Sequence, residues 1–167
     1  MARVVIKFGG TSLGSIEKIT NVASLIKKKK TNNDEIIVVV SAMAGQTNDL
    51  IEKSKKISKN YDKAELDVLL ATGEQMSSSL LSAALIDQGC KSRSWLSWQI
   101  PIITEGPHNA SRIYRSNTDE ISKFLKSGGI PIIPGFQGVS NIFRLTTIGR
   151  GGSDASAVAI AKFFDAD

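Results

Sequence analysis

Residues 4–12 read Val-Val-Ile-Lys-Phe-Gly-Gly-Thr-Ser, and this stretch joins a β-branched run, a lysine, two glycines and two hydroxyls. The apolar run that opens it suits a core strand, and Gly9 and Gly10 let the backbone turn where a side chain would clash. A hydroxyl among residues 11–15 can cap the helix that follows, whose N-terminal N–H groups favour an anion. Lys7 would lie at the strand's carboxyl end and point at the same place. The stretch predicts a phosphate site, although it matches neither GxxxxGK[ST] nor GxGxxG.

The composition is that of an ordinary globular domain. The chain has 167 residues, of which 41% are hydrophobic, and this is enough for one domain with a sizeable core. Its longest apolar runs, such as residues 36–40, are far shorter than the roughly 20 residues of a membrane-spanning helix. The first residues lack a signal-peptide pattern. We therefore expect one domain, no membrane partner and a cytoplasmic location.

The positive net charge raises the question of a nucleic-acid partner. The charge of +5 comes from 21 Lys+Arg against 16 Asp+Glu. The lysines of residues 27–30 close a predicted helix, and those of residues 53–59 decorate another. Because no aromatic residues interleave with them, as a nucleic-acid platform would require, we predict a solvated surface and no nucleic-acid partner.

Cysteine and histidine each occur once. Cys90 excludes an internal disulfide and a thiolate metal cluster, so we expect a reduced, semi-buried packing residue. His108 lies in a predicted loop with no cysteine or second histidine near it. We expect it at the surface, and we expect neither a protein metal site nor Ser-His-Asp hydrolysis.

The hydrophobic pattern alternates between short β-branched runs and longer helical periods, which is typical of an α/β protein with a parallel sheet. Gly73 is expected to interrupt the longest helix, and the two prolines of the third predicted strand to limit its ladder pairing. The pattern predicts strands at residues 4–8, 36–40, 130–134 and 143–148, and helices at 15–29, from about 48 to 59, and at 63–88, 118–126 and 155–164.

Four segments combine small residues with one decisive polar group, and in an open parallel sheet such loops converge on one crevice. Each alone has a plainer explanation: a glycine turn, a helix cap by Asn48, a solvent-facing Glu74, or an N-cap beside a surface Arg150. A buried Glu74, however, would need a partner or a polar cavity. Arg150 beside Gly-Gly-Ser-Asp would combine a fork for a carboxylate with open N–H groups. The segments are residues 7–12, 41–48, 72–75 and 149–154.

Five motifs follow one another through the whole chain: KFGGTS at 7–12, VVVSAMAGQTN at 38–48, TGEQ at 72–75, GFQG at 135–138 and IGRGGSDASA at 148–157. Together they closely resemble the aspartate kinases of the amino-acid kinase superfamily. The resemblance implies a three-layer αβα sandwich with a mostly parallel sheet. It also implies ATP-dependent phosphorylation of the β-carboxylate of L-aspartate to 4-phospho-L-aspartate, the first step of lysine, threonine and methionine synthesis.

The resemblance assigns roles to the matching residues. Lys7 is expected to stabilise the transferring phosphoryl group, and Asp154 to orient Lys7. Glu74 suits the α-ammonium of aspartate, and Arg150 its α-carboxylate. Mg²⁺ is expected to accompany ATP on phosphate oxygens and water. The implied nucleotide side consists of Lys7, Phe8, Gly9, Gly10 and Ser41, and the implied aspartate side of Thr47, Glu74, Phe136, Arg150, Gly151, Gly152 and Ser153.

Aspartate kinases continue beyond these motifs. Their further strand, their loops around the nucleotide and their regulatory ACT domains have no counterpart here, so residues 1–167 are expected to be a single partial catalytic domain whose C-terminal nucleotide-binding part is missing. A natural fragment, a split product and an incomplete sequence are all compatible with this. We expect an unpaired sheet edge and a homo-oligomer, or association with the missing part. Two alternatives remain: another kinase of the superfamily, acting on acetylglutamate, glutamate or a nucleotide, and a non-catalytic aspartate-binding or assembly module.

Overall fold

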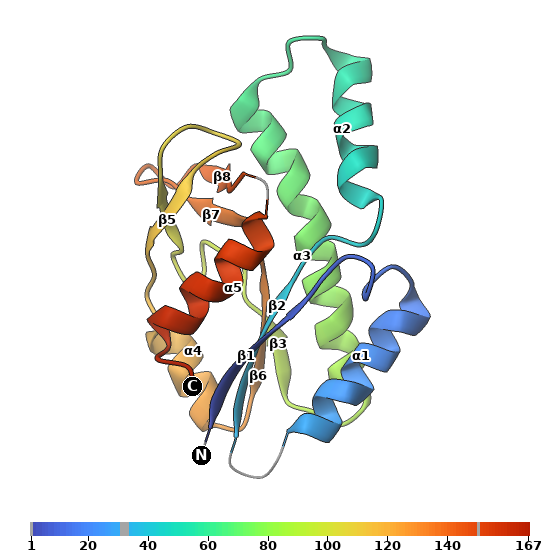
Figure 1. Cartoon of the computed structure of the whole chain (residues 1–167), viewed down its shortest axis with the longest axis vertical. Coiled ribbons are helices and arrows are strands. Elements are labelled where there is room, and N and C mark those ends of the chain that lie inside the picture. The colour runs from blue at the N-terminus through green and yellow to red at the C-terminus, as the bar shows by residue number, and fades with distance from the viewer. Residues whose placement is uncertain (1, 31–33, 150) are drawn as a thin grey trace.

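The computed structural model describes residues 2–30, 34–149 and 151–167. They form two four-stranded sheets and the helices around them (Figure 1). None of the described helices is long and apolar enough to cross a membrane. Along the chain the elements are β1 (Arg3–Phe8), α1 (Ile16–Lys29), β2 (Glu35–Val40), α2 (Gln46–Ile57), α3 (Lys63–Asp87), β3 (Ser92–Ser94), β4 (Ile103–Glu105), β5 (Arg112–Arg115), α4 (Asp119–Lys126), β6 (Ile130–Pro134), β7 (Gln137–Val139), β8 (Leu145–Thr147) and α5 (Gly152–Phe163).

The first sheet is parallel throughout, with the order β1-β2-β6-β3. Helices α1 and α3 cover one of its faces, and α4 and α5 cover the other (Figure 1). Strand β2 is buried along its whole length, so alternate residues reach opposite layers: Val38 packs in the cluster of α1 and α3, and Val39 in that of α4 and α5. A parallel strand covered on both faces must be apolar nearly throughout. These layers confirm the predicted αβα sandwich, and the free thiol of Cys90 packs against the first cluster as expected.

The second sheet, of order β5-β4-β7-β8, was not predicted. It is mixed, since β4 pairs antiparallel with β5 and parallel with β7, and β7 pairs antiparallel with β8. Its strands have three or four residues each, too few for an alternating pattern to stand out. The predicted strand 143–148 shortens to β8, because Phe143 has a φ of 57° and lies in the preceding turn.

Gly73 does not interrupt the long helix, so that prediction was wrong. Helix α3 runs unbroken from Lys63 to Asp87. A Cβ built on Gly73 would lie 2.9 Å from the Cβ of Ala42. The glycine therefore serves the close approach of α3 to the loop after β2.

The two prolines of β6 limit its pairing as predicted. β6 pairs with β2 over Ile132–Pro134 and with β3 over Ile130–Ile132. The N–H of Ile130 bonds toward β3, and that of Gly135 bonds toward β2. Alternate N–H groups of a strand point to opposite neighbours, so the nitrogen of Pro131 faces β2 and that of Pro134 faces β3. Neither nitrogen can donate, and the ladder with β2 starts after Pro131 while the ladder with β3 ends before Pro134.

Candidate active site

The carboxyl ends of β1, β2 and β6 lie side by side. Ser41 N–H donates to the carbonyl of Phe8 at 3.0 Å, and Gly135 N–H donates to that of Val40 at 2.9 Å. A cavity of about 230 Å³ opens beside these ends. It collects the implied aspartate-side residues together with Ser41; Arg150 lies outside the described residues. The cavity is lined by Ser41, Ala42, Thr47, Glu74, Phe136, Gly149, Gly151, Gly152 and Ser153.

Lys7 and Asp154 meet at the end of β1. The Lys7 Nζ lies 2.8 Å from Asp154 Oδ1, with the two side chains 27% and 69% exposed. Asp154 belongs to the first turn of α5, where a carboxylate is favoured by the helix dipole. A Cβ built on Gly9 would lie 3.7 Å from the Lys7 ammonium. The lysine is thus oriented by a carboxylate while part of its surface stays open to an incoming anion.

The loop after β1 packs against the loop after β2. A Cβ on Gly10 would lie 2.6 Å from the carbonyl oxygen of Ala42, and Ala44 N–H donates to the Gly10 carbonyl at 3.1 Å. Among the hydroxyls considered for capping α1, Ser15 takes the role, accepting from Lys18 N–H at 3.2 Å. Gly10 is therefore required by this close backbone contact, whatever it also binds.

Helix α2 begins differently from the prediction. Its N-cap is Gly45, which has a φ of 83°, a conformation that glycine adopts without strain. Asn48 lies inside the helix, so the proposed cap by Asn48 was wrong. Thr47, in the first turn, lines the cavity instead.

Glu74 is a buried carboxyl group on the wall of the cavity. The residue is 4% exposed, which rules out the solvent-facing alternative. Its Oε1 accepts from Ala42 N–H at 3.0 Å, and its Oε2 has no hydrogen-bond partner among the described residues. Burial raises the pKa of Glu74 to about 7, against the opposing effect of the Ala42 hydrogen bond. A buried carboxylate oxygen without a hydrogen-bond partner favours a cation beside it.

The start of α5 favours an anion, whereas Glu74 favours a cation. Its N-cap, Gly151, has a φ of 73° and no side-chain cap, and the N–H groups of a helix start favour an anion. Ser41 Oγ donates to Ser153 Oγ at 2.8 Å, which links this helix start to the loop after β2. A Cβ on Gly152 would lie 2.6 Å from the Phe136 ring. The cavity thus combines a carboxylate and a helix N-terminus, as a zwitterion requires.

Asp67 and His108 form a contact that sequence reasoning missed. His108 Nδ1 lies 2.5 Å from Asp67 Oδ2; the aspartate side chain is fully buried and the histidine side chain is 30% exposed. His108 lies in a loop with a partly exposed side chain, in line with the expected surface position, and what the sequence did not predict is its Asp67 partner. The available signal was Asp67 itself, an acidic residue two helical turns before Glu74 in an otherwise apolar run.

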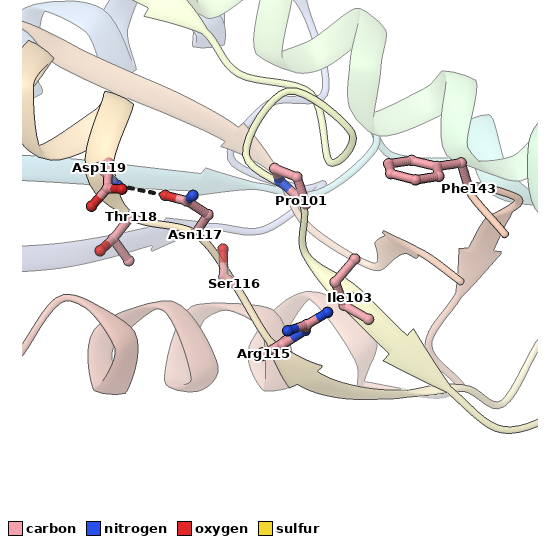
Figure 2. A pocket seen from close by; sticks show the side chains of 8 residues that line it. All are labelled: Pro101, Ile103, Arg115, Ser116, Asn117, Thr118, Asp119 and Phe143. Atoms are coloured by element: carbon pink, nitrogen blue, oxygen red, sulfur yellow. Dashed lines mark hydrogen bonds between the residues drawn. The ribbon is translucent and has the colours of Figure 1, made fainter. Parts of the chain in front are cut away.

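A second, larger hollow of about 560 Å³ lies away from these loops (Figure 2). It is formed by the start of α4, the end of β5 and the turn that carries Phe143. Asn117 Oδ1 accepts from Asp119 N–H at 2.9 Å there. No residue of the five motifs lines it, and its charged side chains, Arg115 and Asp119, are exposed. We place the candidate active site at the smaller cavity, where the motifs meet.

A family model described as the amino acid kinase family matches residues 2–167. The chain belongs to the amino acid kinase family. Among curated family members, it is 44% identical over 167 residues to an aspartate kinase of Stutzerimonas stutzeri and 46% identical over 167 residues to aspartokinase 2 of Bacillus subtilis. Both matches cover this whole chain, which spans about 40% of the length of these relatives.

Solved structures of amino acid kinases share the fold. An aspartate kinase from Synechocystis superposes with a TM-score of 0.84 at 41% identity, over all of this chain and 27% of its own. Aspartokinase III of E. coli, in complex with aspartate and ADP, superposes with a TM-score of 0.82 at 22% identity, over 99% of this chain and 47% of its own. The second likeness speaks for the fold alone.

Within the described part of this amino acid kinase, no three His, Cys, Asp or Glu side chains gather as ligands for a metal ion. The acidic side chains of the site have other arrangements: Asp154 pairs with Lys7, and Glu74 accepts a backbone N–H. The described part of the site therefore consists of a lysine, backbone N–H groups, hydroxyls and one buried carboxyl group with an unpartnered oxygen.

Proposed function

We propose that this chain carries the L-aspartate site of an aspartate kinase, an enzyme that transfers the γ-phosphoryl group of ATP to the β-carboxylate of L-aspartate. The observation that carries the proposal is Glu74, a buried residue that lines the cavity and whose Oε2 has no hydrogen-bond partner among the described residues. An α-ammonium would supply the missing donor and charge. An N-acetylated amino acid would not, which favours aspartate over acetylglutamate.

The α-carboxylate would lie at the other side of the cavity. The uncapped start of α5 and the Ser153 hydroxyl offer donors for it, and the resemblance adds the guanidinium of Arg150. With both α-substituents held, the β-carboxylate would be left as the free end of the substrate. Fixing the substrate at its non-reacting groups is how binding energy orients the reacting one.

Lys7 is the group that we assign to the transferring phosphoryl. Phosphoryl transfer between anions depends on positioning and charge neutralisation more than on a protein nucleophile. The Asp154 carboxylate, 2.8 Å away, would hold the ammonium in place, and the backbone of Gly9 and Gly10 would cradle phosphate beside it. Mg²⁺ would enter with ATP as part of the substrate, on phosphate oxygens.

Trapping with hydroxylamine tests the reaction class. Purified chain, ATP and Mg²⁺ are incubated in turn with L-aspartate, L-glutamate and N-acetyl-L-glutamate, and any acyl phosphate is captured as its hydroxamate. The proposal expects a hydroxamate from L-aspartate alone, which is lost in Lys7→Ala. Preference for another acid would assign a different amino acid kinase activity. Absence of product from every acid would show that this chain alone does not transfer the phosphoryl group, and would leave the aspartate-binding half of a kinase or a non-catalytic module.

A further inference from the structure

Asp67 is a fully buried carboxylate outside the cavity. It lies on α3, two helical turns before Glu74, and its residue exposure is 0%. It is not among the residues that line the cavity. Neither the proposed aspartate contacts nor the phosphoryl site uses it, so its burial needs another explanation.

The partners of Asp67 come from two separate segments. The hydroxyl of Thr147, the last residue of β8, donates to Oδ1, and so does Asn109 N–H at 3.1 Å. His108 Nδ1 lies 2.5 Å from Oδ2. Ser111, just after this loop, is tied to the same strand end, since its N–H and Oγ both donate to the Thr147 carbonyl, at 3.1 and 2.8 Å. One carboxylate thus fastens both β8 and the loop 108–111 to α3.

The fastened strand end leads directly into the cavity. Thr147 stands two residues before Gly149, which lines the cavity, and the start of α5 follows within five residues. Ile148 N–H, between them, donates to the carbonyl of Phe136 at 2.8 Å. Since Asp67 and Glu74 share one rigid helix, the Asp67–Thr147 bond fixes where Gly149 and the start of α5 lie relative to the Glu74 carboxylate.

We propose that Asp67 is a positioning residue for the amino-acid site: through Thr147 and the loop 108–111 it sets Gly149 and the start of α5 against Glu74. The inference takes its ligand, L-aspartate, from the proposed function. The positioning of the segment after Thr147 by Asp67 does not depend on that function. Loss of the carboxylate should free the strand end and loosen the segment that follows Thr147.

The test compares Asp67→Ala with Glu35→Ala, and Asp67→Asn serves as the conservative variant. Glu35 is a matched control because it is another buried carboxylate held by a side chain, that of Arg3 at 2.7 Å, and it lies at the amino end of β2, away from the cavity. Amide hydrogen exchange of the unliganded chain measures how often the segment after Thr147 opens. Calorimetric titration with L-aspartate measures the affinity of the site.

In Asp67→Ala we expect the amide hydrogen exchange rates of residues 145–153 to be at least tenfold higher than in Glu35→Ala. We also expect the affinity for L-aspartate to fall at least tenfold. Asp67→Asn, which keeps an acceptor for Thr147, should restore most of both. Equal effects of Asp67→Ala and Glu35→Ala on residues 145–153 would overturn the inference. If Asp67→Ala does not fold, the isosteric Thr147→Val is expected to show the same changes in smaller measure. The wild-type chain could fail to bind L-aspartate while Asp67→Ala still exchanges faster than Glu35→Ala in residues 145–153. That result would refute the proposed function and leave the positioning role of Asp67 established.

Discussion

At Glu74, burial and charge oppose each other. The carboxyl group is buried: its Oε1 accepts from Ala42 N–H, and its Oε2 has no hydrogen-bond partner among the described residues. Such a group costs stability whenever it is ionised without a partner. Asp67, on the same helix, is also buried but has three hydrogen-bond partners. The two acids therefore differ in role, because Asp67 is satisfied inside the protein and Glu74 is left incomplete toward the cavity.

Because the buried carboxyl group of Glu74 lacks a full set of partners, we expect the free energy of unfolding to depend on pH. Because the pKa of Glu74 is raised from its ordinary value of 4.5 to about 7, the folded chain holds this proton more tightly than the unfolded chain, and stability from this group falls as the pH rises through that window. We expect Glu74→Gln to be more stable than wild type by up to about 3 kcal/mol at about pH 8 and nearly equal to it below the ordinary value. Denaturant unfolding at both pH values measures the difference; a difference independent of pH would contradict the burial of an ionisable Glu74.

Substitutions of Lys7 and Arg150 should change different kinetic constants, kcat for Lys7 and the KM for aspartate for Arg150. Lys7→Ala removes the charge assigned to the phosphoryl group and is expected to lower kcat by a factor of 100 or more, on the order of 3 kcal/mol of transition-state stabilisation, with little change in KM for aspartate. Arg150→Ala, on the assignment made from the resemblance, should mainly raise that KM. Steady-state kinetics with varied aspartate distinguish them, and Arg144→Ala, whose guanidinium pairs with exposed Glu65 on α3, controls for loss of a cation. An unchanged KM in Arg150→Ala would remove it from the aspartate site.

At the scale of elements, the site is made by three strand ends, and short-range pattern was a good guide to them. The strands at 4–8, 36–40 and 130–134 were predictable because their apolar β-branched runs are long enough to show. Helix starts were less predictable, since α2 and α5 begin at glycines with positive φ and no side-chain cap. A polar cap is the usual signal of a helix start, and these two helices lack one.

The contact between the first two loops gives a prediction for this scale. Gly10→Ala would place a Cβ 2.6 Å from a backbone oxygen, that of Ala42, so it should destabilise the fold by roughly 1–3 kcal/mol. Gly14→Ala in the same loop meets only ordinary contacts at 3.5 Å and should change stability by less than about 1 kcal/mol. Thermal unfolding of the two variants measures the contrast. If both variants lost the same stability, the close packing of the two loops would be wrong.

At the scale of the whole molecule, the αβα layering and the convergence of the motifs on one cavity were predictable, and the second sheet and the Asp67 network were not. The layering follows from alternating strand and helix patterns. Asp67 meets Thr147 across 80 positions of sequence, and no local pattern encodes such a pairing. The small second sheet depends likewise on contacts that form only after the first sheet has brought distant segments together.

The two core layers share β2 and β6, so they should unfold together. Leu85, in the cluster of α1 and α3, is fully buried, and Leu85→Ala is expected to cost roughly 2–5 kcal/mol. Trp95 belongs to the cluster on the opposite face and reports that layer by fluorescence. We expect far-ultraviolet circular dichroism and tryptophan fluorescence to shift to the same new midpoint in this variant. A fluorescence midpoint that stayed at the wild-type value would mean that the layers unfold separately.

The central claim, that the cavity takes the α-ammonium of L-aspartate on Glu74, is tested most directly by calorimetric titration of wild type and Glu74→Gln with L-aspartate and with succinate, which lacks the amino group. Glu65→Gln, an exposed change on the same helix, is the control. We predict that wild type and Glu65→Gln bind L-aspartate but not succinate, and that Glu74→Gln loses at least tenfold in aspartate affinity, about 1.4 kcal/mol or more. Binding of succinate as tight as that of L-aspartate, or an unchanged affinity in Glu74→Gln, would contradict the claim.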